Sequence, residues 1–213
     1  MIDSLALCLV TNYQHDSLPA YLDFLGQVIE GGVTAVQYRD KTNPLPVIRK
    51  TAIAIKQFLS PYSVPLIIND YVALAAEIDA DGVHIGQSDC SPARARALLG
   101  SDKLIGYSIE SLAQLNVANQ LEALDYVAAS AVFPSQTKTD CQTIWGLAGL
   151  KEVVQKSHHP VVAIGGITHD NACEVIKQGA AGIAVVSALH DHPSPSRAAS
   201  QLIQQIRKGK DHV

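Results

Sequence analysis

The sequence has few cysteines, no excess of positive charge and no long hydrophobic run, and each shortage excludes a class of protein. Its four cysteines, Cys8, Cys90, Cys141 and Cys173, lie far apart and form no Cys-x-x-Cys pair. This spacing excludes a small disulfide scaffold and a zinc knuckle, and it favours reduced thiols. A formal net charge of −4 gives no general attraction to nucleic acid or to an anionic membrane. Any bound anion must therefore be held by a few local cations.

The N-terminus also lacks the marks of a targeting segment. No basic flank precedes its apolar run, residues 5–10, and that run is too short for a signal-peptide core or a membrane span. We therefore expect a cytoplasmic protein that acts on small molecules, with neither nucleic acid nor membrane as a partner.

What the chain does have is the composition of one globular domain. Hydrophobic residues make up 47% of its 213 residues and charged residues 17%, a length and a balance that allow a sizeable core. No linker, charge block or low-complexity segment interrupts the chain. We expect residues 1–213 to form a single catalytic domain.

Short apolar runs alternate with segments of helical periodicity along the whole chain. The predicted strands are 5–11, 33–38, 64–68, 82–85, 103–107, 125–129, 160–164 and 181–186. The predicted helices are 18–30, 45–59, 71–78, 92–99, 111–121, 147–156, 170–178 and 195–207. Eight such units indicate an α/β fold, a single (β/α)8 TIM barrel. An open doubly wound sheet is the alternative, but residues 11–14 after the first strand do not resemble its glycine-rich turn.

A barrel places its active site on the loops that follow the strands, and these loops carry polar residues. Asp70 and Asp89 follow the third and fourth strands and are oxygen ligands suited to Mg²⁺. Arg39, Lys41 and Lys138 would neutralise a diphosphate. The remaining candidates are polar contacts at other strand ends and backbone amides for a monophosphate: Gln37, Asn69, Ser108, Ser135, Thr137, Gly166, Val186 and Ser187. One diphosphate, one cation and one monophosphate suggest a two-substrate transfer that releases diphosphate.

Each of these residues also has a plainer interpretation. An Asp after a strand is more often a helix N-cap than a metal ligand, and a Gly-Gly pair is more often a turn than a phosphate cradle. Ser108 could cap a helix. His84, inside a strand, is expected to be a packed or hydrogen-bonded core residue, and His190, Asp191 and His192 are expected to be solvated. The position of the whole set at strand ends is what favours a site.

Seven segments, in this order, resemble the thiamine phosphate synthase family, and the resemblance covers nearly the whole chain. The segments are QYRDK (37–41), IIND (67–70), DGVHIGQSD (81–89), IGYS (105–108), VFPSQTK (132–138), AIGGI (163–167) and AVVSA (184–188). The resemblance implies a TIM-barrel transferase of thiamine biosynthesis. It would join hydroxymethylpyrimidine diphosphate to a thiazole phosphate, giving thiamine phosphate and diphosphate by a dissociative reaction.

The resemblance also implies roles for individual residues. Mg²⁺ would be held by Asp70 and Asp89. The residues implied for the pyrimidine diphosphate are Gln37, Tyr38, Arg39, Asp40, Lys41, Asn69, Ser108 and Lys138. Those implied for the thiazole phosphate are Ser135, Gln136, Thr137, Gly166, Val186 and Ser187. The partners are small phosphorylated substrates, and a homo-oligomer is left open.

Two departures from the family pattern fall in one loop. Ser130-Ala131 stands where the family commonly has Gly-Pro, and Ser135 stands for its usual Thr.

A thiazole tautomerase-like isomerase is the nearest alternative function, but its expected histidine is absent at 130–131. A non-catalytic barrel that binds phosphorylated ligands is the alternative from another class, because fold alone does not fix function.

Overall fold

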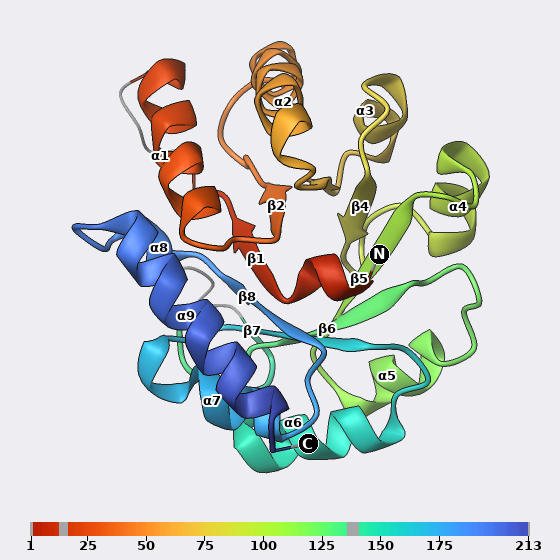
Figure 1. Cartoon of the computed structure of the whole chain (residues 1–213). Coiled ribbons are helices and arrows are strands. Elements are labelled where there is room, and N and C mark those ends of the chain that lie inside the picture. Colours follow the sequence, from red (N-terminus) through yellow and green to blue (C-terminus); the bar gives the residue numbers. More distant parts are fainter. Residues whose placement is uncertain (1, 13–16, 136–140, 213) are drawn as a thin grey trace.

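The computed structural model describes residues 2–12, 17–135 and 141–212, and its eight parallel strands close into a barrel in the order β1 to β8 (Figure 1). The barrel predicted from the sequence is confirmed. The strands are β1 (Leu7–Val10), β2 (Ala35–Tyr38), β3 (Leu66–Asn69), β4 (Gly82–Ile85), β5 (Leu104–Ile109), β6 (Tyr126–Ser130), β7 (Val161–Ile164) and β8 (Gly182–Val185).

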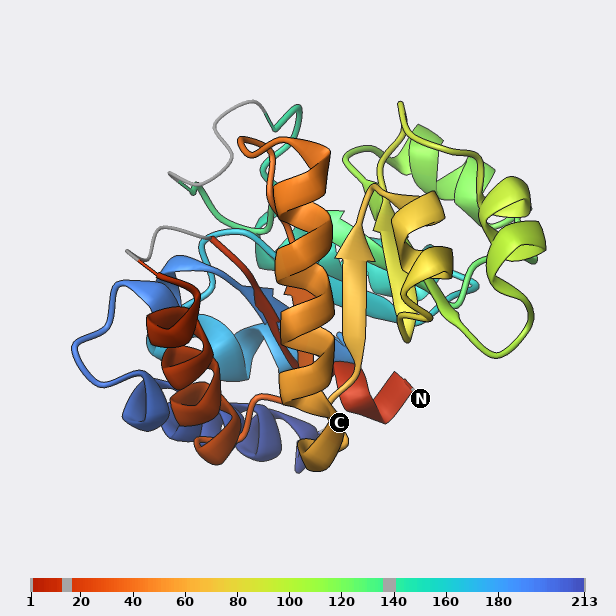
Figure 2. The same ribbon diagram turned by 90° about the horizontal axis from the view of Figure 1, so that it is seen from above.

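Helices surround this barrel and run back along its outside (Figures 1 and 2). They are α1 (Leu18–Glu30), α2 (Leu45–Leu59), α3 (Val72–Glu77), α4 (Pro92–Leu99), α5 (Leu112–Ala118), α6 (Gly146–Lys156), α7 (His169–Lys177), α8 (Ser187–His190) and α9 (Pro195–Lys210). Two short 3-10 helices, η1 (Ile2–Leu5) and η2 (Ser60–Tyr62), complete the described elements. None of the helices in the described ranges is long and apolar enough to cross a membrane.

Strand alternation divides the apolar side chains into two cores. The larger core fills the layer between the barrel and its helices and includes Leu9, Val36 and Ile68. The smaller one lies inside the barrel and includes Cys8, Ala35 and residues of several other strands. Because many inward side chains are small, the upper part of the barrel interior is left open.

The lower part of the barrel is closed by the first turn of the chain. Figure 1 shows η1 lying across the barrel axis, and Leu5 at its end is 1% exposed. The Leu5 carbonyl oxygen would lie only 2.0 Å from a Cβ added at Gly182. Glycine at this position therefore lets η1 seat directly against β8.

Several predicted boundaries agree with the structure, and others differ for local reasons. The strand expected at 5–11 begins at Leu7 because η1 takes the preceding residues. β5 continues to Ile109, so Ser108 lies within the strand and not after it. The four-residue helix α8 was not predicted.

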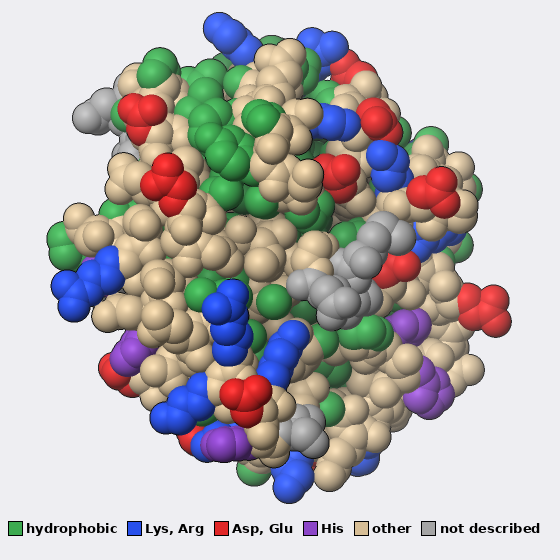
Figure 3. Space-filling view, viewed as in Figure 1, with side chains coloured by type: hydrophobic (Ala, Val, Ile, Leu, Met, Phe, Trp, Pro, Cys, Tyr) green, Lys and Arg blue, Asp and Glu red, His purple; other side chains and the backbone are tan. Residues whose placement is uncertain are grey.

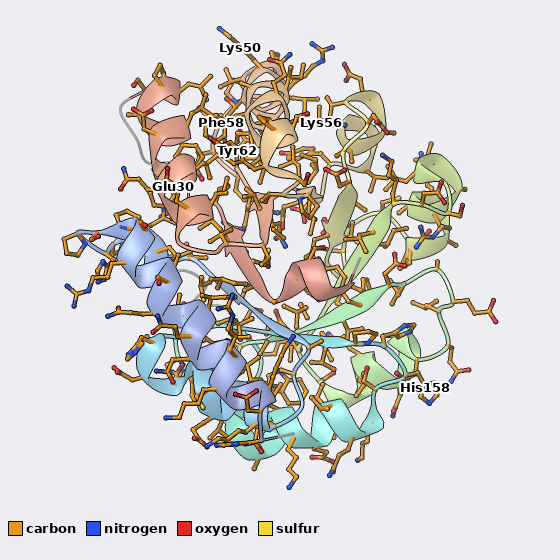
Figure 4. All side chains as sticks on the ribbon, in the orientation of Figure 1. Glu30, Lys50, Lys56, Phe58, Tyr62 and His158 are labelled. Carbon is orange, nitrogen blue, oxygen red and sulfur yellow. The ribbon has the colours of Figure 1, made fainter. Side chains whose placement is uncertain are left out.

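The outer surface carries charged side chains of both signs. Figure 3 shows Lys, Arg, Asp and Glu scattered over the face that bears η1. One of these residues, Lys56 on α2, has its ammonium 2.9 Å from the Ile78 carbonyl oxygen at the end of α3 (Figure 4). Such contacts join neighbouring helices of the outer layer.

Candidate active site

A cavity of about 610 Å³ opens at the carboxyl ends of the strands and reaches down inside the barrel to Leu5. This is the edge where parallel barrels carry their active sites. Eleven of the predicted site residues line it: Gln37, Arg39, Lys41, Asn69, Asp70, Asp89, Ser108, Ser135, Gly166, Val186 and Ser187. Gln136, Thr137 and Lys138 lie outside the described residues.

Arg39 brings a cation to this cavity. Its backbone is fixed by Thr11, whose hydroxyl accepts from the Arg39 N–H at 2.8 Å and donates to the Arg39 carbonyl at 3.0 Å. Within the described ranges, no acidic side chain forms an ion pair with the Arg39 guanidinium, whereas Lys41 pairs with Asp70. A half-buried guanidinium without a protein counter-ion is suited to an anionic ligand.

Two buried side-chain amides face the same cavity. Gln37 is 6% exposed and Asn69 is 9% exposed. Neither side chain makes a hydrogen bond to another described residue. Buried amides are costly unless they are hydrogen-bonded, so partners for Gln37 and Asn69 must come from the contents of the cavity.

Asp70 and Asp89 form a carboxylate pair at the ends of β3 and β4. Asp70 adopts a left-handed backbone conformation, with φ of +64°, and its N–H donates to the His84 carbonyl at 2.8 Å. Burial, together with the neighbouring Asp89 carboxyl, raises the pKa of Asp70 in spite of its contact with Lys41. A cation between these carboxylates would relieve both effects.

Tyr38 and Asp40 do not line the cavity, unlike the residues that alternate with them. Tyr38 points outward into the core between barrel and helices. The Asp40 carboxylate accepts from the backbone N–H groups of Thr42 and Asn43, each at 3.0 Å, and from the Asn43 side chain at 2.8 Å. Their side chains therefore support the loop, and the substrate contact expected for the segment 37–41 stays a prediction.

Gly165 and Gly166 follow β7 beneath the loop that leaves β6. Gly166 has φ of +61°, and a Cβ there would lie 2.5 Å from the Pro134 carbonyl oxygen. The pair thus serves turn geometry and close packing, and it lines the cavity beside Val186 and Ser187 as well.

Sequence reasoning missed several residues that line the cavity from within the strands. Tyr126 and Ala128 of β6 face inward, and so does His84 of β4. His84 is buried and hydrogen-bonded as expected, but its ring also forms part of the cavity wall. The register that sets His84 beside Asn69, a predicted contact, is seen only in the structure.

His190 also differs from its prediction. It belongs to α8, its ring stacks on Phe24 with centroids 4.6 Å apart, and its Nε2 accepts from the Asn12 N–H at 3.1 Å. It is therefore packed against α1 and the loop that follows β1, and not solvated. Among the described residues, no group of three or more His, Cys, Asp or Glu side chains could hold a metal.

Comparison with known proteins identifies the fold and its relatives. Residues 7–189 match the family model described as thiamine monophosphate synthase. The chain belongs to this family. It is 42% identical over 203 residues to the thiamine-phosphate synthase of Chlamydia abortus, covering 95% of each chain. It is 43% identical over 197 residues to that of Vibrio parahaemolyticus, covering 92% of this chain and 96% of the relative.

A solved structure leads to the same family. A thiamine phosphate pyrophosphorylase from Pyrococcus furiosus superposes with a TM-score of 0.87 at 32% identity, covering 98% of both chains. The family assignment made from the sequence motifs is confirmed, and with it the assignment to thiamine-phosphate synthases, which are transferases of thiamine biosynthesis.

Proposed function

We propose that this chain transfers the hydroxymethylpyrimidine group from its diphosphate to a thiazole phosphate, forming thiamine phosphate and releasing diphosphate. The observation that carries the proposal is Arg39, a cavity-lining guanidinium that forms no ion pair with any described residue. Family membership supplies the identity of the diphosphate, and Arg39 supplies a place to bind it.

In this proposal the pyrimidine diphosphate lies along β2, β3 and β5. Arg39 and Lys41 bind its phosphates, and the buried amides of Gln37 and Asn69 pair with its polar atoms. Ser108 contributes a hydroxyl, and Lys138 adds a further cation. Tyr38 and Asp40 act only by holding the segment 37–41 in place.

The thiazole phosphate takes the opposite side of the cavity. Its phosphate is bound by backbone N–H groups near Gly166 and at Val186 and Ser187, which line the cavity after β7 and β8. Ser135, Gln136 and Thr137 offer polar contacts from the loop after β6. The two substrates then approach each other over the open barrel interior.

The residues present also fit a magnesium ion. Asp70 and Asp89 are two hard oxygen donors at adjacent strand ends, and Mg²⁺ commonly binds one or two carboxylates with substrate phosphates and water. The raised pKa of Asp70, caused by burial and by the Asp89 carboxyl, indicates a pair that a cation would stabilise. When bound, Mg²⁺ would neutralise charge on the leaving diphosphate.

The chemistry proposed for the protein is positioning and charge stabilisation. A dissociative transfer, in which diphosphate departs before the thiazole nitrogen captures the pyrimidine methyl group, requires no protein nucleophile. Arg39 and Lys41 would stabilise the negative charge that develops as diphosphate leaves. The apolar barrel interior would exclude water from the reactive carbon.

The test is an assay of purified protein with Mg²⁺, hydroxymethylpyrimidine diphosphate and the thiazole phosphate. We expect equal amounts of thiamine phosphate and diphosphate. Replacement Asp89→Asn keeps an oxygen that can accept from the Gly86 N–H, a 2.7 Å contact, but removes the charge. It should lower turnover by more than about 100-fold, while the exposed control Asp102→Asn should not. A folded wild-type protein that binds both substrates and forms no product would refute the transfer and favour a non-catalytic binding protein.

Three further points belong to the same proposal. We propose that residues 1–213 act as one catalytic domain and that the protein works in the cytoplasm. A homo-oligomer remains compatible with the proposal, because the substrate contacts named here all come from one chain.

A further inference from the structure

Three polar side chains form a hydrogen-bonded row across the barrel interior. His84 in β4 lies between Tyr126 in β6 and Ser108 in β5. Its Nδ1 is 3.0 Å from the Tyr126 hydroxyl, and its Nε2 is 2.8 Å from the Ser108 hydroxyl. His84 is 6% exposed and Tyr126 is 2% exposed. All three line the cavity, yet only Ser108 has a role in the proposed binding of substrate.

A glycine in β5 leaves the space that these side chains need. Gly106 lies between the side chains of His84 and Tyr126, and it pairs in register with both residues. A Cβ at Gly106 would lie 2.1 Å from Tyr126 Cζ and 2.5 Å from His84 Nδ1. Any other residue at position 106 would force the rings apart. The contact between Tyr126 and His84 therefore depends on a specific glycine.

The direction of the hydrogen bonds follows from the phenol. Burial raises the pKa of Tyr126 well above its ordinary value, so Tyr126 keeps its proton. Because Tyr126 is only 2% exposed, its hydroxyl hydrogen needs an acceptor within the protein. Among the described residues, the acceptor within reach is His84 Nδ1. A neutral imidazole that accepts at Nδ1 carries its proton on Nε2.

This tautomer of His84 determines in which direction the Ser108 hydroxyl can donate its hydrogen. His84 Nε2–H donates to the Ser108 oxygen, so the hydrogen of the Ser108 hydroxyl cannot be directed at His84. It is left to point into the cavity. The opposite tautomer would make Nε2 an acceptor and would draw the serine hydrogen away from the ligand.

We propose that Tyr126 and His84 are positioning residues that hold the Ser108 hydroxyl as a hydrogen-bond donor toward an acceptor atom of the pyrimidine diphosphate. The proposal rests on the function proposed above, since it assigns Ser108 to that substrate. It adds two residues whose effect on substrate passes entirely through Ser108.

The first test reads the tautomer directly. Nitrogen-15 NMR of protein labelled at histidine distinguishes a protonated Nε2 from a protonated Nδ1, and the His84 signals are assigned by their loss in His84→Asn. We expect wild-type His84 to be neutral, with its proton on Nε2. A proton on Nδ1, or on both nitrogens, at neutral pH overturns the proposal. This measurement needs no substrate, and the variant serves only to assign the wild-type signals.

The second test separates positioning from packing by a double-mutant cycle. Tyr126→Phe keeps the ring and removes the hydroxyl, and we expect about a tenfold rise in KM for the pyrimidine diphosphate with little change in KM for the thiazole phosphate. In a Ser108→Ala background the same change should have no further effect. Equal effects of Tyr126→Phe in both backgrounds would show a structural role and overturn the proposal. Tyr62→Phe, at an exposed tyrosine, is the matched control.

The two tests also distinguish this proposal from the function on which it rests. If wild-type protein forms no thiamine phosphate, the proposed function fails and the NMR result still decides the tautomer. If turnover is normal and the proton lies on Nδ1, the function stands and the positioning role is rejected.

Discussion

Arg39 shows how one side chain can be committed to a ligand by its surroundings. Its backbone is tied to Thr11 by two hydrogen bonds, and its guanidinium forms no ion pair with the other described residues. Lys41, two residues later, contacts Asp70. The two cations of one segment therefore differ before a ligand binds, since Lys41 is paired with a carboxylate of the protein and Arg39 is not.

Arg39→Lys tests this difference at constant charge. Lysine offers a point charge where arginine can bind two phosphate oxygens with its planar fork. We expect KM for the pyrimidine diphosphate to rise by about tenfold or more, with no change in the free energy of unfolding. Steady-state kinetics measures the first and urea unfolding the second. Arg49→Lys, at an exposed arginine paired with Glu77, should change neither, and an unchanged KM in Arg39→Lys would contradict the assigned contact.

The side chain of Asp40 contributes to the stability of the loop after β2. Although its burial alone would raise the pKa, hydrogen bonds from Asn43 and Thr42 hold the pKa of Asp40 below its ordinary value. A carboxyl whose pKa is lower in the folded than in the unfolded state stabilises the fold fully at pH above its unfolded-state pKa. This stabilisation is lost as the pH falls through the folded-state pKa. Asp40 should therefore stabilise the fold at neutral pH and lose this effect in acid.

Asp40→Asn should lower the free energy of unfolding at pH 7 by about 1 to 2 kcal/mol, because the ionised acceptor of five hydrogen bonds is replaced by a neutral amide. The difference from wild type should shrink as the pH falls below about 4. Urea unfolding of both proteins between pH 7 and pH 3 measures it. A difference that is constant over this range would show that the charge of Asp40 plays no part.

At the scale of elements, the turn after β7 packs closely against the loop that leaves β6. Gly166 lies beneath the loop from β6, which carries Ser135, and has neither room for a side chain nor a φ that favours one. Gly146 offers a matched comparison, since its φ of +58° is nearly the same and no atom lies within 4 Å of an added Cβ.

Gly166→Ala should therefore cost more than Gly146→Ala. Both variants carry the backbone strain of about 1 kcal/mol that a left-handed conformation imposes on alanine. Only Gly166→Ala adds an overlap with Pro134, which should cost about 1 to 3 kcal/mol more and raise KM for the thiazole phosphate. Thermal unfolding and steady-state kinetics measure the two effects. Equal destabilisation of the two variants would mean that the β6 loop moves aside without cost.

The element boundaries that could be predicted are those with local chemical signals. α4 begins after Ser91, whose hydroxyl accepts from the Arg94 N–H, and it ends at Gly100. No such signal announces α8, which is only four residues long. The end of β5 was missed because pairing with β6 continues to Ile109, a tertiary contact that local sequence does not encode.

The residues of the candidate site also divide into those that could be predicted from the sequence and those that could not. Residues at strand ends, such as Arg39 and Asp89, could be predicted because parallel strands bring their carboxyl ends together. Tyr126 and His84 lie within strands, and their contact depends on register and on the space left by Gly106. Tyr38 and Asp40 were assigned to substrate because they belong to a matching motif, whereas alternation along β2 turns Tyr38 away from it.

At the scale of the whole molecule, the site draws on every strand of a closed barrel, so ligand binding and folding are coupled. A ligand that binds only the folded state raises the free energy of unfolding by about 2.7 kcal/mol when its concentration is 100 times Kd. Diphosphate with Mg²⁺ contains the groups that Arg39, Asp70 and Asp89 are proposed to bind.

Diphosphate and Mg²⁺ together should therefore raise the melting temperature by several degrees, and a chelator should abolish the rise. Either component alone should give a smaller shift, and Asp89→Asn should respond weakly to the mixture. Thermal unfolding followed by circular dichroism measures this. An equal shift with diphosphate alone would place the anion away from the two carboxylates.

The seating of η1 has a practical consequence for attaching this protein to a surface or to a fluorescent label. Leu5 is part of the cavity wall, so the start of the chain lies within one turn of the space where substrate binds. The end of α9 lies on the same side of the barrel, away from the mouth (Figure 2), but no residue of α9 lines the cavity. A linker joined after α9 disturbs neither the open end of the cavity nor its closed end. A linker joined before η1 is attached directly to the element that closes the cavity.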